Sequence, residues 1–141
     1  MSIDQKKDEE LYQEAIKQIF SEGVIDHGQN PRNCGVIAKS NAFGIIFGPC
    51  GDTMAVWLYI ENNRITDISF TTDGCMTSIA AGSMATELAK DRILTNAQKL
   101  NQQDILNALG GLPKDSEHCA LLAANTIKEA INDYLIPNTQ T

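Results

Sequence analysis

The order of its secondary structure constrains this chain most, because three strand-like segments follow one another and helices come after them. Residues 42–48, 53–60 and 64–71 are rich in β-branched and aromatic residues or alternate apolar with polar positions. Only a few residues separate neighbouring segments, and a parallel pair needs a crossover of about a dozen residues or more. Asn62-Asn63 suits a tight hairpin turn, since Asn tolerates positive φ. The sequence therefore predicts an α+β fold, with helices packed on one face of a three-stranded antiparallel sheet.

Helical periodicity marks the rest of the chain. An amphipathic helix is predicted over residues 4–20. Its pattern ends at Gly23, and the turn residues from Gly28 to Gly35 predict a loop. Gly110-Gly111 and Pro113 end a helix before the last one begins. The helices predicted after the strands cover residues 76–90, 95–100, 103–109 and 116–135. In the last of them the expected buried stripe is Leu121, Leu122, Ile127, Ala130, Ile131 and Tyr134.

The length of 141 residues is typical of one domain. The sequence contains no internal repeat, no low-complexity segment and no linker-like stretch. We therefore expect a single domain over residues 1–141, in which residues 1–19 form an N-terminal helix and residues 20–136 form the core.

The charge balance excludes two classes of partner. The net charge is −7 and the basic residues are spread along the chain, so we expect neither nucleic acid nor an anionic membrane surface to bind.

No apolar run approaches the roughly 20 residues that a membrane-spanning helix needs. The N-terminal ten residues are polar and lack the apolar region of a secretory signal, which predicts a cytoplasmic protein. In that compartment the four cysteines should stay reduced.

Three cysteines occupy similar local settings. Cys50 lies in the turn between the first two strands, Cys75 lies where the third strand gives way to a helix, and Cys119 lies in the first turn of the last helix. The unpaired N–H groups of a helix N-terminus favour an anion, so this position lowers a thiol's pKa and makes thiolate available for metal or sulfur chemistry. Asp52 adds a carboxylate and His118 an imidazole. These residues form a candidate metal or sulfur site.

The residues alone leave another interpretation open. An unpaired cysteine in a cytosolic domain is often a buried packing residue, and no C-x-x-C pair is present. Cys34, in a loop without nearby ligand types, is expected to be structural or incidental. His27 is expected at a loop or helix end and not among the ligands.

Four segments resemble one known family in the same order along the chain. They are Val24-Ile25-Asp26-His27 with Asn30-Pro31-Arg32-Asn33, Cys50-Gly51-Asp52, Gly74-Cys75 with the small residues up to Ser83, and Gly110-Gly111-Leu112-Pro113 with His118-Cys119. The chain thus resembles the NifU/IscU-type iron–sulfur cluster scaffold proteins, over residues 20–131.

The resemblance implies a compact SufE/NifU-like α+β fold and a role as a scaffold. It implies that Cys50, Cys75 and Cys119 receive sulfur from a cysteine desulfurase, bind iron and hold a [2Fe–2S] cluster, which then passes to apo-proteins. Asp52 matches the aspartate that keeps the cluster labile, since a carboxylate is a more exchangeable ligand for iron than a fourth thiolate. His118 is a neighbour or an alternative ligand.

Departures from the family pattern bear on partners. The segment from Leu112 to Ser116 lacks the second proline and the valine of the IscU chaperone-binding segment, which speaks against recognition by an Hsp70-type chaperone. Met76 follows Cys75 where glycine is common.

Two alternative functions remain. One is a zinc-dependent sulfur-transfer protein of SufU type, although the insertion of that branch is absent between Cys75 and Cys119. The other is a zinc-stabilised interaction module. Cys₃Asp ligation suits zinc as well as iron, so zinc could occupy the resting protein.

Overall fold

The computed structural model describes residues 3–49 and 51–136, and its sheet confirms the predicted meander. Strands β1 (Ala42–Phe47), β2 (Thr53–Glu61) and β3 (Arg64–Thr72) are antiparallel neighbours in the order β1-β2-β3. Asn62 and Asn63 connect β2 to β3 with φ of 52° and 64°. Both values lie in the left-handed region that a tight hairpin requires.

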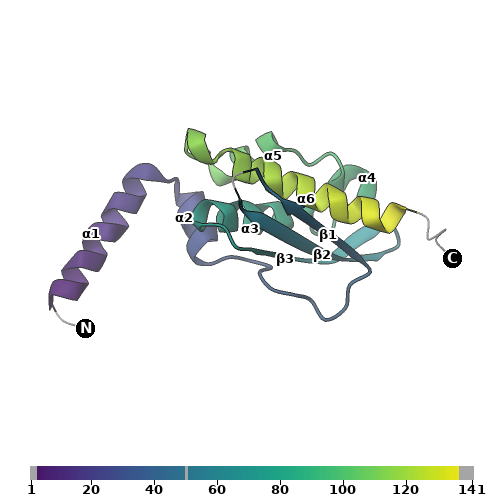
Figure 1. Ribbon diagram of the computed structural model, residues 1–141, viewed down its shortest axis with the longest axis horizontal. Coiled ribbons are helices and arrows are strands. Elements are labelled where there is room, and N and C mark those ends of the chain that lie inside the picture. The colour runs from purple at the N-terminus through teal and green to yellow at the C-terminus, as the bar shows by residue number, and fades with distance from the viewer. Residues whose placement is uncertain (1–2, 50, 137–141) are drawn as a thin grey trace.

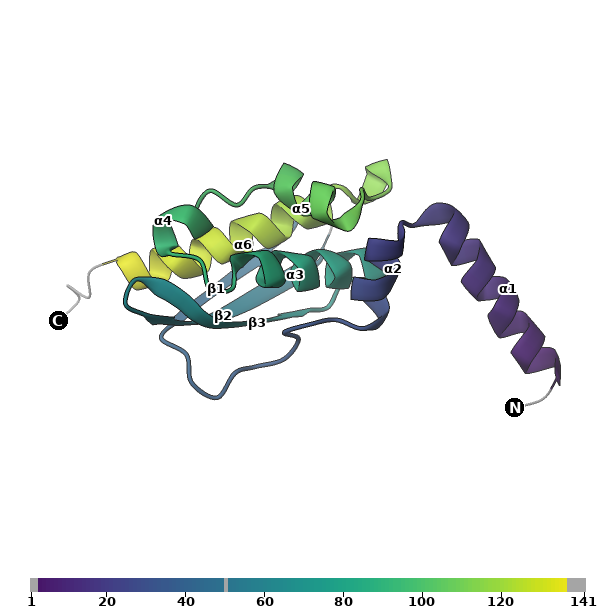
Figure 2. The same cartoon turned by 180° about the vertical axis from the view of Figure 1, so that it is seen from behind.

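Two helices cover one face of this sheet, as predicted. Helix α6 (His118–Leu135) packs on β1 and β2, and α3 (Met76–Ala89) packs on β3 and beside α6 (Figures 1 and 2). Gly44 shows how close the layers are, because a Cβ added there would lie 2.5 Å from the backbone nitrogen of Ala130 in α6. Only glycine fits at this crossing.

Shorter helices link α3 to α6. Helix α4 (Leu94–Ala97) joins the β2–β3 hairpin through a 2.9 Å hydrogen bond from Leu94 N–H to Asn63 O. Helix α5 (Gln102–Leu109) starts with a capping box and ends at Gly110, whose φ is 83°. A single 3₁₀ turn, η1 (Lys114–Ser116), then leads directly into α6. The helices predicted in this region are therefore confirmed, with shorter bounds for α4 and α6.

The expected buried stripe of α6 is partly wrong. Leu121 is 44% exposed and Tyr134 is 39% exposed, while the other four members are buried. Small residues occupy many of the buried positions of α6, chiefly Ala120, Ala123, Ala124 and Ala130. A helix that packs this closely on a sheet and on a second helix favours small side chains at the contact, so larger apolar ones are displaced to its flanks.

The N-terminal region holds one helix that was predicted and one that was not. Helix α1 (Ile3–Ile19) confirms the first prediction. Helix α2 (Glu22–Gln29) lies where the helical pattern was expected to end, just before and at the start of the predicted loop, and it packs against α3. The Ser21 side chain caps it by accepting a hydrogen bond from Val24 N–H at 3.1 Å. The sequence did not predict this helix because it contains Gly23 and Gly28, and only proline has a lower helical propensity than glycine.

Helix α1 projects away from the rest of the molecule in both ribbon views (Figures 1 and 2). Ile16 is buried, but Leu11, Tyr12 and Ile19 are each more than 60% exposed. The apolar stripe of α1 thus contacts the rest of the chain only near the C-terminal end of the helix.

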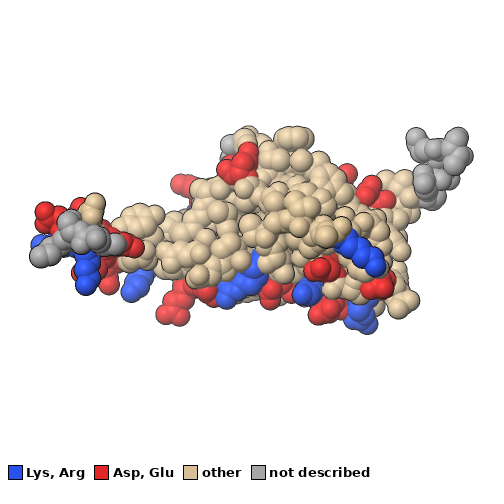
Figure 3. Space-filling view, turned by 90° about the horizontal axis from the view of Figure 1, so that it is seen from below, with Lys and Arg blue, Asp and Glu red and all other residues tan. Residues whose placement is uncertain are grey.

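The face of the sheet opposite the helices carries apolar side chains in contact with solvent. Alternate residues of β1 are exposed on this face, namely Phe43, Ile45 and Phe47. The centroid of the Phe43 ring lies 5.3 Å from that of the Trp57 ring in β2. In the view of Figure 3, uncharged residues form much of the surface, and acidic and basic side chains are interspersed along one edge. In the described part of the chain, no helix has both the length and the apolar character to cross a bilayer.

Candidate metal centre

The predicted site residues come from three elements that meet at one end of the sheet. Asp52 directly precedes β2, Cys75 is the N-cap of α3, and Cys119 lies in the first turn of α6. Near this end Met54 of β2 pairs with Thr72, the last residue of β3. The antiparallel meander therefore brings Asp52 close to the start of α3. Cys50, the remaining predicted ligand, lies outside the described residues.

Asp52, His118 and Cys119 form a compact group of potential ligands. One ligand atom from each lies within 4.8 Å of the others, and Nε2 of His118 is 3.8 Å from Cys119 Sγ. Asp52 and His118 are half-buried, while Cys119 is only 2% exposed and belongs to the hydrophobic core. A thiolate, an imidazole and a carboxylate at this spacing suit zinc or iron.

Cys75 is not a member of that compact group, but a hydroxyl connects it to the group. Its exposed Sγ lies 3.1 Å from Thr77 Oγ1, which is 3.6 Å from Cys119 Sγ. The hydrogen bond with the Thr77 hydroxyl holds the pKa of the Cys75 thiol below its usual value, and the backbone N–H groups of Thr77 and Ser78 act in the same direction. Partial burial and the nearby Asp52 charge oppose this shift. The net effect lowers the pKa of Cys75, which is the direction that its helix N-terminal position predicted.

Thr77 and Ser78 are site residues that the sequence reasoning missed. Both are buried in the first turn of α3, and Ser78 Oγ donates a hydrogen bond to Asp52 Oδ2 at 2.8 Å while lying 3.4 Å from Cys119 Sγ. The available signal was a pair of hydroxyl residues directly after a cysteine at a helix start. Such residues interact with thiols and carboxylates, but their type alone does not announce a ligand.

Cys34 and His27 lie elsewhere in the fold. Cys34 is exposed, and its segment pairs with β3 through hydrogen bonds that both involve Phe70. His27 is buried in the last turn of α2, where its Nδ1 lies 2.7 Å from Ser83 Oγ.

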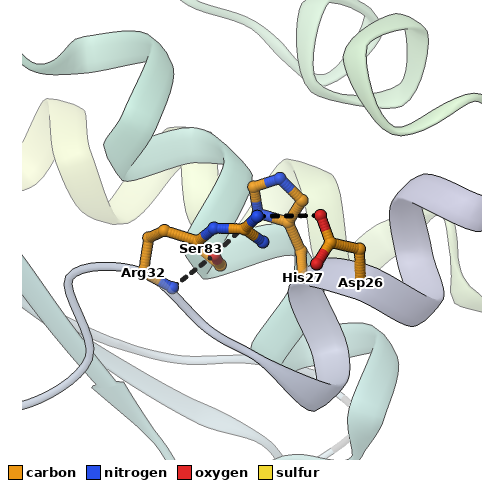
Figure 4. A network of polar contacts seen from close by, with 4 residues as sticks. All are labelled: Asp26, His27, Arg32 and Ser83. Carbon is orange, nitrogen blue, oxygen red and sulfur yellow. Dashed lines mark hydrogen bonds and ion pairs between the residues drawn. The ribbon is translucent and has the colours of Figure 1, made fainter.

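A polar network surrounds this histidine (Figure 4). Ser83 Oγ also accepts the backbone N–H of Arg32 at 2.9 Å, and the Arg32 guanidinium pairs with Asp26 at 2.8 Å. The guanidinium lowers the pKa of Asp26, chiefly through their hydrogen bond. Burial, followed by the Arg32 charge, lowers the pKa of His27. The network therefore joins α2 and the following loop to α3, and it serves the fold.

The fold and the potential metal ligands together define a class of protein. It is a small α+β domain that presents thiol, carboxylate and imidazole groups at one end of its sheet, where strands end and helices start. The family model described as the NifU-like N terminal domain matches residues 19–141. The chain is also 45% identical over 121 residues to the iron-sulfur cluster assembly scaffold protein IscU 1 of Archaeoglobus fulgidus, covering 85% of this chain and 79% of that protein.

Solved structures support the same architecture. The N-terminal part of a nitrogen-fixing NifU-like protein from Brucella abortus aligns with a TM-score of 0.65 at 17% identity, covering 85% of this chain and 96% of the other. A SufU-type scaffold protein of Fervidobacterium islandicum aligns with a TM-score of 0.61 at 19% identity, covering 81% and 97%. At these identities the likeness concerns the fold. The chain belongs to the NifU-like N-terminal domain family, so the resemblance seen in its motifs is confirmed.

Proposed function

We propose that this protein is a scaffold on which iron–sulfur clusters are assembled and from which they are handed to apo-proteins. The observation that carries the proposal is the grouping of Asp52, His118 and Cys119 within 4.8 Å of one another, with Cys75 connected to Cys119 through the Thr77 hydroxyl. Its IscU relative from Archaeoglobus fulgidus is a named scaffold for this assembly.

In this proposal the cluster is cargo. Cys50, Cys75 and Cys119 hold the iron of a [2Fe–2S] cluster, with Asp52 as the exchangeable fourth ligand and His118 as its neighbour or substitute. The lowered pKa of Cys75 supports a further role, because thiolate is the form that receives sulfur from a cysteine desulfurase. The protein acts as a scaffold and not as an enzyme, and we propose the cytoplasm as its location, where thiols stay reduced.

The test is anaerobic reconstitution with ferrous iron, cysteine and a cysteine desulfurase, followed by transfer to an apo-ferredoxin. We expect visible absorption of a [2Fe–2S] cluster on the wild type and its movement to the ferredoxin. In Asp52→Ala the thiolates remain, so assembly should persist, but transfer should slow because the exchangeable ligand is gone. Equal transfer rates for wild type, Asp52→Ala and Asp52→Asn would remove Asp52 from the ligand set. Absence of any cluster on the wild type would contradict the function.

Zinc-dependent sulfur transfer is the second candidate, and the donor set supports it. Thiolate, carboxylate and imidazole ligands suit tetrahedral zinc as well as iron. The two functions differ in what sulfide and iron do to the zinc-loaded protein. A scaffold exchanges zinc for a cluster, whereas a sulfur-transfer protein retains stoichiometric zinc while one cysteine exchanges sulfur. Metal analysis before and after reconstitution separates them.

A further inference from the structure

The hydroxyl of Ser78 lies between two of the proposed ligands, which belong to different parts of the chain. It donates a hydrogen bond to Asp52 Oδ2 at 2.8 Å, and the same oxygen is 3.4 Å from Cys119 Sγ. We propose that Ser78 is a positioning residue that holds the Asp52 carboxylate ready for metal binding. The inference rests on the proposed metal site and adds a residue that neither its ligand chemistry nor its sequence pattern assigns.

The burial of Ser78 gives its hydroxyl few other partners. The side chain is fully buried in the first turn of α3. A buried hydroxyl must find its hydrogen bonds within the protein, since one left unsatisfied costs about 1–3 kcal/mol. A hydroxyl group can donate one hydrogen bond, and Ser78 donates it to Asp52. The orientation of this hydroxyl is therefore tied to the carboxylate.

The Asp52 backbone accepts a hydrogen bond from Gly48 N–H at 2.6 Å, but in the described structure Ser78 is the hydrogen-bond partner of its carboxylate. Asp52 is half-buried and follows the exposed Gly51, whose φ of 90° belongs to a turn. The hydrogen bond from Ser78 holds the carboxylate against the start of α3. A ligand that is already oriented loses less conformational freedom when the metal arrives.

Gly74 provides a separate indication that the pair is closely accommodated. A Cβ added at this position would lie 2.9 Å from Asp52 Oδ2 and 2.5 Å from Ser78 Cβ. The backbone before Cys75 thus approaches both partners closely, and the absence of a side chain at residue 74 leaves room for their hydrogen bond. Replacing Gly74 with alanine should therefore disturb the pair although neither Asp52 nor Ser78 is substituted.

The consequence concerns metal affinity. Partners that orient metal ligands by hydrogen bonding typically change affinity by about 10–100-fold when they are removed. We expect Ser78→Ala to weaken Co²⁺ binding by about tenfold. Because Ser78 acts through Asp52, this loss should disappear when Asp52 is already alanine.

The experiment is an anaerobic Co²⁺ titration of the chelator-treated full chain, followed by the thiolate-to-cobalt charge-transfer and d–d bands. The variants are Ser78→Ala, Asp52→Ala, the double variant and Gly74→Ala. Ser69→Ala is the matched control, because Ser69 is also a buried serine and its hydroxyl has no hydrogen-bond partner in the described structure. Circular dichroism confirms that each variant is folded. We expect weaker binding for Ser78→Ala and Gly74→Ala, wild-type affinity for Ser69→Ala, and no further loss from Ser78→Ala in the Asp52→Ala background.

Three results would overturn the inference. The first is wild-type affinity in Ser78→Ala, the second is an equal loss in the presence and absence of Asp52, and the third is wild-type affinity in Asp52→Ala. If Ser78→Ala does not fold, Gly74→Ala decides alone, and wild-type cobalt affinity in that variant rejects the role. A wild type that binds no cobalt would reject the metal site itself, whereas cobalt binding unaffected by Ser78→Ala rejects only the role of Ser78.

Discussion

Cys75 and Cys34 are both exposed, so exposure does not distinguish a functional thiol from an incidental one in this chain. What differs is the immediate surroundings. The Cys75 sulfur contacts the Thr77 hydroxyl at 3.1 Å at the start of a helix, and its pKa is lowered. Cys34 lies in a loop that pairs with the edge of the sheet. The two thiols therefore form a natural comparison.

Cys75→Ser should abolish most cluster assembly, whereas Cys34→Ser should leave it intact. A serine hydroxyl is a poor ligand for iron at neutral pH, because thiolates are the ligands that iron–sulfur clusters require. We expect the reconstituted absorbance of Cys75→Ser to fall by at least about tenfold, because loss of a residue that only orients a ligand already costs about 10–100-fold in metal affinity. The measurement is visible absorption after reconstitution at equal protein concentration. The opposite pattern, loss in Cys34→Ser and retention in Cys75→Ser, would contradict the site.

His27 should make the fold sensitive to mild acid. Its pKa is lowered in the folded protein by burial, so between its folded pKa and its usual value of 6.5 the unfolded chain binds more protons than the folded one. Stability therefore rises with pH across this window and is lost as pH falls below about 6.5. Arg32 adds to the shift, while Asp26 and Glu87 oppose it. We expect a lower urea midpoint at pH 5.5 than at pH 7.5.

The control for this prediction is His27→Gln, which removes the titrating group. It should be less stable than the wild type at pH 7.5, because the contact with Ser83 is disturbed, but its urea midpoint should change less between the two pH values. A wild type and a variant with the same dependence on pH would show that other groups are responsible.

At the scale of elements, the strands could be predicted because their side chains alternate and their connections are short. The hairpin at Asn62-Asn63 follows from local backbone preferences, and the structure places both residues at positive φ. Helix α2 could not be recognised from periodicity, since two glycines interrupt it, although Ser21 carried the capping signal. The exposure of Leu121 depends on how closely α6 approaches its neighbours, which is a property of tertiary packing.

The candidate site shows the same division between local and tertiary information. Ligand types at the starts of α3 and α6 are local features, and they were predicted. The hydrogen bond between Ser78 and Asp52 joins positions that are distant along the chain, so only the fold reveals it. That the predicted ligands bind iron stays a prediction.

The segment around η1 is the element that bears on chaperone binding. Leu112 packs against the core, and the following residues form a 3₁₀ turn that leads into α6. The segment from Leu112 to Ser116 also lacks the second proline and the valine of the IscU chaperone-binding segment, which speaks against recognition by an Hsp70-type chaperone. We expect calorimetric titration of the full chain with an IscU-type Hsp70 system to give a dissociation constant weaker than about 1 μM, or about −8 kcal/mol. Tighter binding would show that the altered segment is still recognised.

At the scale of the whole molecule, helix α1 differs from the other helices because it projects away from the packed part of the fold (Figures 1 and 2). Its exposed stripe of Leu11, Tyr12 and Ile19 contributes little to the packed core, whereas Ile16 is buried. The division that we propose, a single domain in which residues 1–19 form a helix before a core of residues 20–136, rests on this contrast.

Deleting residues 1–14 should change the free energy of unfolding by less than about 0.5 kcal/mol, as expected for surface changes. Ile16→Ala in the full chain should cost more, about 2 kcal/mol, because it removes a buried side chain. Urea denaturation of both variants and the wild type tests this. A deletion that costs as much as Ile16→Ala would make α1 an integral part of the folded unit.

Covering the sheet on one face only also gives the molecule an optical reporter. Trp57 is the only tryptophan, and it lies half-buried against Phe43 on the face that the helices leave open. Its emission thus arises on the opposite side of the sheet from α3 and α6. A macromolecule that docks on the open face would shift the emission towards shorter wavelength by removing water from the indole. Fluorescence from this single residue would then record docking on that face directly, with no label added.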